Sequence, residues 1–194
     1  MNSQMIEDLF KILENKFSEF KIEKNKKNTH RKGFLEKIEN ATSNIHLFGL
    51  NFPNYITNPD DKIHKTLKDL DYNGSIINVY IYIPSTKIKD EIEKLNVYEK
   101  KLQPSNLKRD IYKIQDFEND FKSLNINIIE YDNLYKIGLS AIDLGTKNAF
   151  VHLSQVKENE LIKDAEYFEI PYSSDTTSLI DTIDELLKRV RNYE

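Results

Sequence analysis

The sequence predicts an α/β protein with a mixed sheet flanked by helices. Three apolar runs of strand length, at 45–50, 76–83 and 126–131, are separated by segments with helical spacing of apolar residues. A fourth and a fifth run lie on either side of the turn residues 144–148, which predicts a β-hairpin. Strands joined through helices favour parallel pairing, and the hairpin adds antiparallel strands at one edge. The 194 residues, 39% of them hydrophobic, are enough for one core.

The N-terminal segment is expected to form an extra amphipathic helix between Gln4 and Lys24. Its apolar residues recur at steps of three and four, and they are Ile6, Leu9, Phe10, Leu13, Phe17 and Phe20. This stripe is the expected partner-binding surface, either for the rest of the chain or for another subunit. The polar residues Asn25–Thr29 interrupt the pattern and predict a hinge. We therefore expect a helix and basic linker over 1–27 and an α/β domain over 28–194.

The remaining elements follow from the same spacing. Helical periodicity predicts helices over 34–41, 63–70, 87–102 and 106–124. The first strand is expected to end at Asn51 and Pro53, and a short strand is expected at 167–170. A final helix, with its N-cap near Ser174 or Asp175, carries a broad apolar stripe.

Charge gives one local signal. The chain has 28 basic and 32 acidic residues, so its net charge of −4 argues against a dedicated nucleic-acid binder. Residues 21–37 are an exception, with two glutamates among the basic residues Lys21, Lys24, Lys26, Lys27, Arg31, Lys32 and Lys37. A solvated linker is the favoured interpretation of this segment, and contact with a phosphate backbone is the less favoured one.

Several classes of chemistry are missing from the sequence. Without cysteine, disulfides, thiol catalysis and thiolate metal sites are excluded. The five glycines form no dinucleotide or NTP phosphate loop, and no histidine has a second one three to five residues away. We expect no cofactor and no metal. No apolar run is long enough to span a membrane and the N-terminus does not resemble a signal peptide, so a cytoplasmic location is expected.

Candidate site residues lie in the strands and after their ends. His46 and His152 alternate with apolar residues, so a structural role is favoured over a role as acid or base. Ligands of open α/β sheets bind beyond the carboxyl ends of the strands. The ligand-binding candidates from this rule are Asn51, Asn54, Ser85, Thr86 and Tyr131, and His46 is a further candidate as a residue that could line a cleft. The Ser85-Thr86-Lys87 turn has the groups to hold a phosphate, although a helix cap explains it more simply.

The order of elements resembles one domain of the phospholipase D-like superfamily. The resemblance rests on the helix opened by Arg31-Lys32, the strand that ends at Pro84-Ser85, the strand that closes on Tyr131-Asp132, and Asp143 in the hairpin. Active members use the motif H-x-K-x4-D, in which the histidine attacks phosphorus. Alignment on Asp143 places Lys136 at the histidine position and Gly138 at the lysine position. The resemblance thus implies the scaffold, and frequently a dimer, without the covalent phosphohistidine reaction.

Two functions from different classes remain open. The first is a catalytically silent phospholipase D-like module that binds or regulates a partner and associates with itself. The second is an enzyme for phosphodiesters or nucleotides with a non-standard site, for which the catalytic candidates are His152, Asp143, Ser85 and Lys87. A sensor of nucleotide signals in bacterial or phage defence is a further alternative. The missing motif residues favour the silent module over an enzyme.

Overall fold

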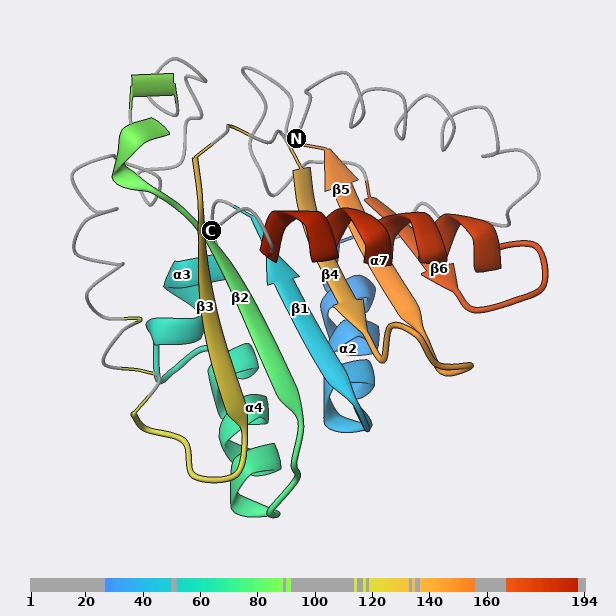
Figure 1. Ribbon diagram of the computed structural model, residues 1–194. Helices are drawn as coiled ribbons and strands as arrows, with labels where there is room; N and C mark the ends of the chain where they lie inside the picture. The colour runs from blue at the N-terminus through green and yellow to red at the C-terminus, as the bar shows by residue number, and fades with distance from the viewer. Residues whose placement is uncertain are drawn as a thin grey trace.

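The computed structural model contains a six-stranded mixed sheet with helices on both faces (Figure 1). The structure describes residues 27–49, 52–88, 90–91, 114, 117, 119–132, 134, 137–155 and 167–191. The strands are β1 (Asn44–Phe48), β2 (Asn78–Pro84), β3 (Asn125–Tyr131), β4 (Ile137–Ile142), β5 (Phe150–Gln155) and β6 (Tyr167–Pro171). The predicted α/β class with a mixed sheet is confirmed.

The strand order is β3-β2-β1-β4-β5-β6. β1, β2 and β3 pair in parallel, whereas β4 pairs antiparallel with β1 and continues into an antiparallel meander through β5 and β6. The predicted hairpin is therefore the pair β4 and β5. The carboxyl ends of the three parallel strands meet at one edge of the sheet, and the amino end of β1 meets the β4–β5 turn at the opposite edge.

Two helical layers bury the two faces of the sheet. The helices α2 (Lys27–Glu39), α3 (Phe52–Thr57) and α4 (Lys62–Tyr72) cover one face, and α7 (Thr177–Arg191) crosses the other (Figure 1). In β1, Ile45 and Leu47 face the three helices, while His46 and Phe48 lie on the α7 side. Both faces of β1 are thus buried, which explains its continuous apolar run.

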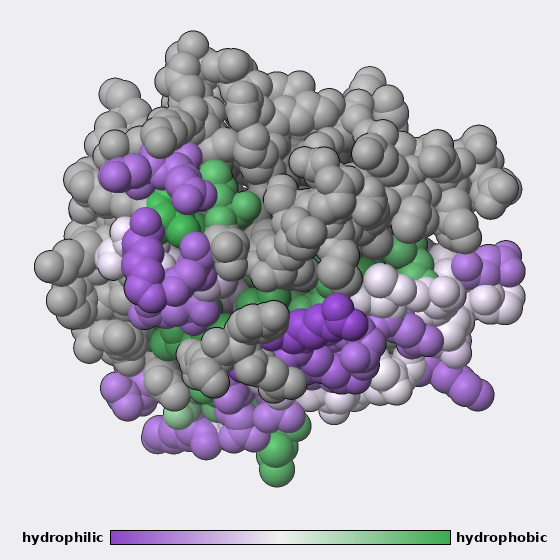
Figure 2. Space-filling view, turned by 45° about the horizontal axis from the view of Figure 1, so that its top comes forward, coloured by the Kyte–Doolittle hydropathy of each residue, from purple (hydrophilic) through white to green (hydrophobic). Residues whose placement is uncertain are grey.

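The helix sequences explain how each helix packs. In α7 the buried residues recur at steps of three and four, and they are Leu179, Ile180, Ile183, Leu186 and Leu187. Burial of each such side chain contributes about 1.5–3 kcal/mol. The outward side of α7 is hydrophilic, with Glu185, Lys188 and Arg189 exposed (Figure 2). The Asp61 side chain caps α4 by accepting a hydrogen bond from the Ile63 N–H at 2.9 Å.

Some sequence-based boundaries are wrong. α2 begins at Lys27, so residues 27–29 of the expected hinge belong to the helix, whereas Asn25 and Lys26 lie outside the described residues. The helix expected to run to Leu124 has ended before Asn119, and residues 119–124 are not helical. At the start of α7 the Thr176 hydroxyl accepts a hydrogen bond from the Ser173 N–H at 2.8 Å, and the Ser173 carbonyl accepts from the N–H groups of Thr176 and Thr177 at 3.2 and 3.1 Å. These two residues flank Ser174 and Asp175, near which the cap was expected.

Other expectations concern parts of the chain outside the described residues. These include the helix at 4–24 with its apolar stripe and most of the two helices expected over 87–102 and 106–124. In the part that the structure describes, no helix is long and apolar enough to cross a membrane.

Candidate functional site

The carboxyl ends of β2 and β3 bring together part of the expected strand-end site. The Ser85 N–H donates to the Tyr131 carbonyl at 3.0 Å, and Lys87 Nζ lies 2.5 Å from Asp132 Oδ2. Ser85 is buried, and Lys87 and Asp132 are exposed at the surface. The parallel pairing of the two strands therefore places these residues at one edge, as the strand-end rule predicts.

The contacts in this cluster favour a structural role. Ser85 Oγ accepts a hydrogen bond from the Lys87 N–H at 3.2 Å and so caps the short 3-10 helix η1 (Thr86–Ile88). The hydrogen bond with Asp132 raises the pKa of Lys87, and the same bond lowers the pKa of Asp132. Because the ammonium already has a carboxylate partner, an anionic ligand would compete with Asp132 for its positive charge.

His46 lies in the core on the α7 side. It is 2% exposed, its Nδ1 lies 3.0 Å from the Tyr82 hydroxyl, and its ring stacks on Tyr80 with centroids 4.6 Å apart. Arg191, at the end of α7, also contacts this cluster, with its guanidinium 4.6 Å from the centre of the Tyr80 ring. The cluster is thus built from β1, β2 and the last turn of α7.

Burial makes His46 a poor acid or base near neutral pH. Desolvation, helped by the nearby charge of Arg191, lowers the pKa of His46 to about 3. Burial also raises the pKa of Tyr82 well above its usual value. Both groups are neutral at pH 7, so their hydrogen bond is a neutral contact inside an apolar layer.

Asp143 is a buried structural carboxylate at the opposite edge of the sheet. Its Oδ1 accepts from the N–H groups of Thr42 and Ser43 at 2.9 and 2.7 Å, and its Oδ2 accepts from the Thr42 hydroxyl at 3.1 Å. These contacts join the β4–β5 turn to the loop before β1. With φ at 53°, Asp143 occupies the left-handed region, which aspartate tolerates better than most residues.

The four catalytic candidates do not converge. His152 lies in the middle of β5, opposite Ser140, and its ring is 6.1 Å from that of Phe34 in α2. Asp143 lies at the amino end of β1, while Ser85 and Lys87 follow the carboxyl end of β2. Because β1 and β2 are parallel, these ends belong to opposite edges of the sheet.

The remaining ligand-binding candidates are dispersed. Tyr131 packs in the α7-side core, stacked on Phe48 at 4.8 Å, as expected for a residue that packs the sheet. Thr86 is exposed in η1 and Asn54 belongs to α3. Asn51 lies outside the described residues. Among the residues that the structure describes, no three His, Asp or Glu side chains gather as metal ligands do.

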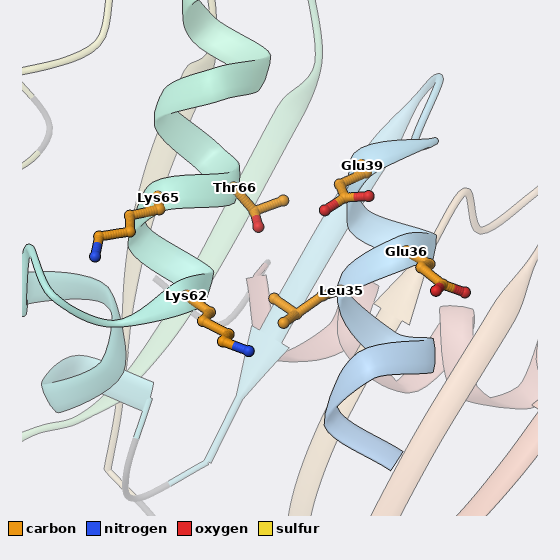
Figure 3. A pocket seen from close by; sticks show the side chains of 6 residues that line it. All are labelled: Leu35, Glu36, Glu39, Lys62, Lys65 and Thr66. Atoms are coloured by element: carbon orange, nitrogen blue, oxygen red, sulfur yellow. The ribbon is translucent and has the colours of Figure 1, made fainter. Parts of the chain in front are cut away.

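A groove of about 350 Å³ lies between α2 and α4 (Figure 3). Its lining residues are Leu35, Glu36 and Glu39 from α2, and Lys62, Lys65 and Thr66 from α4. We call Glu36 and Glu39 the acidic wall and Lys62 and Lys65 the basic wall of the α2–α4 groove. All four are exposed, whereas Leu35 and Thr66 between them are buried. Sequence reasoning missed this groove because spacing within one helix does not reveal which helices are neighbours.

No protein-family model and no curated protein matches the chain. Among solved structures, the chain is similar to TrmBL2, an archaeal chromatin protein whose structure shows a novel mode of DNA binding. The two are 14% identical with a TM-score of 0.47, over 96% of this chain and 60% of the TrmBL2 chain. This chain therefore spans less than two thirds of that protein.

Proposed function

We propose that the chain is a catalytically silent phospholipase D-like module that binds or regulates a partner and associates with itself. The observation that carries the proposal is the state of Asp143, the one residue that fills its position in the H-x-K-x4-D register. Its buried carboxylate already holds Thr42 and Ser43. A carboxylate used in this way stabilises the fold and has little capacity left for substrate.

The other motif positions support the same proposal. Gly138, at the lysine position, lies in β4 opposite Ser154 and has no side chain to hold a phosphate oxygen. His46 is buried and neutral, and His152 lies in the middle of β5, away from the edge where Asp143 is found. An attacking imidazole beside Asp143 would require another arrangement of these strands.

A turnover assay tests the silent part of the proposal. The full chain, in excess over bis(p-nitrophenyl) phosphate, should release nitrophenol no faster than buffer does. His152→Gln serves as the matched variant, because glutamine keeps a polar side chain but cannot act as the nucleophile. Turnover by the native chain that His152→Gln abolishes while the protein stays folded would contradict the proposal and favour the enzyme interpretation.

A further inference from the structure

We propose that the α2–α4 groove is the surface through which two copies of this chain associate. The inference rests on the self-association in the proposed function and goes further by naming the interface. The groove places two exposed glutamates on one side and two exposed lysines on the other, with the buried Leu35 and Thr66 between them (Figure 3).

The charges of the groove lie at unfavourable ends of their own helices. Glu36 and Glu39 occupy the last turn of α2, where the helix dipole is negative, and Lys62 and Lys65 occupy the first turn of α4, where it is positive. Each wall is also a pair of like charges three residues apart, which is destabilising in an isolated helix. A facing surface of opposite charge would relieve both of these costs.

The two helices run in the same direction. α2 leads directly into β1 and α4 into β2, and these two strands are parallel. A two-fold axis along the groove, parallel to the helices, would place α2 of one copy on α4 of the other at the same height. The acidic wall of each copy would then face the basic wall of the second copy, so the charge pairs form twice in one isologous interface.

Charge complementarity favours a second copy over other occupants. A polyanion such as nucleic acid would be attracted by Lys62 and Lys65 but repelled by Glu36 and Glu39 across the same groove. A basic peptide would be attracted by the two glutamates but repelled by the two lysines. A surface that carries one wall of each sign is complementary to itself, and charged interfaces of this kind determine register and partner choice.

Charge reversal with the full chain tests the interface by sedimentation velocity. Glu36→Lys with Glu39→Lys makes the groove wholly basic, and Lys62→Glu with Lys65→Glu makes it wholly acidic. Each double variant alone should dimerise at least tenfold more weakly than the native chain. An equimolar mixture of the two should recover the dimer, because opposite walls then meet again. Both reversals suit the helix dipoles, so each variant should remain folded, as judged by a cooperative thermal unfolding transition.

The matched control changes the same number of charges on the other face of the molecule. Asp175→Lys with Asp181→Lys, both exposed, should leave dimerisation unchanged. If both groove variants dimerise as strongly as the native chain, the α2–α4 interface is wrong, although the proposed self-association still holds. If the native chain is monomeric, both the interface and the self-association are wrong. Binding of a nucleic-acid oligomer that is lost in Lys62→Glu with Lys65→Glu would overturn the second copy as occupant.

Discussion

The carboxylate of Asp143 accepts the backbone N–H of Ser43 at 2.7 Å, a contact between residues 100 positions apart in the sequence. It joins the turn of the β4–β5 hairpin to the loop that leads into β1. Asp143 thus has a clear task in the folded chain, which is to hold the amino end of β1.

Asp143→Ala should lower the free energy of unfolding by about 2–4 kcal/mol, because the substitution leaves two partly buried N–H groups without their acceptor and places alanine at a positive φ. Asp143→Asn is the matched control. Asparagine tolerates this backbone conformation and keeps one oxygen, so it should lose less than half as much. Urea unfolding measures both values. Equal losses in the two variants would contradict the role given to the carboxylate.

His46 should make the fold less stable as the pH falls. Its pKa is about 3 in the folded chain and about 6.5 when unfolded, so below pH 6.5 the unfolded chain binds the extra proton. Stability from this group is present above pH 6.5 and is lost progressively down to about pH 3. The loss between pH 7 and pH 5 should be about 2 kcal/mol, as measured by urea unfolding at the two values.

A double variant isolates this effect. His46→Phe together with Tyr82→Phe keeps the aromatic packing and removes both hydrogen-bonding partners at once, so no buried hydroxyl is left alone. Its stability should change between pH 7 and pH 5 by about 2 kcal/mol less than that of the native chain. An unchanged pH dependence would show that His46 is not the group responsible.

Asp71 should anchor the loop that leads into β3. Its Oδ1 accepts the N–H groups of Lys122, Ser123 and Leu124 at 2.9, 2.6 and 3.1 Å. Burial acts to raise its pKa, but these bonds together with the charge of Lys68 lower it below the usual value. Asp71→Ala should cost about 1–3 kcal/mol of unfolding free energy at pH 7.

The contribution of Asp71 should also depend on pH. Because its folded pKa is lowered, the charged form stabilises the fold above the unfolded pKa of about 3.9, and that stability is lost as the pH falls further. The difference between the native chain and Asp71→Asn should therefore shrink when unfolding is measured at pH 3 instead of pH 7. A constant difference would argue that packing, and not charge, accounts for the effect.

The sequence predicts the sheet well because burial on both faces produces continuous apolar runs. The predicted runs 45–50 and 126–131 differ from β1 and β3 by no more than two residues at either end. The helix α3 escapes prediction, since six residues are too few for a period and Pro53 resembles a break, although proline is tolerated in the first turn of a helix. Residues 122–124, which were expected to be helical, donate their N–H groups to Asp71, and spacing cannot reveal such contacts between residues about 50 positions apart.

The candidate site is less predictable for a related reason. The strand-end rule brings Ser85 and Tyr131 together correctly, because parallel strands share an edge. The bond between His46 and Tyr82 depends on the register of two strands, and the α2–α4 groove depends on which helices become neighbours. One signal for the groove is present in the sequence, namely like charges at the unfavourable ends of two helices, but it becomes informative only with the helix boundaries known.

The mass of the full chain in solution is the most direct test of the account, because a silent module that associates with itself must form an assembly. Sedimentation equilibrium at low ionic strength should give twice the 22.9 kDa of one chain, with dissociation as salt is added. A mass of 22.9 kDa at every protein and salt concentration would contradict the account.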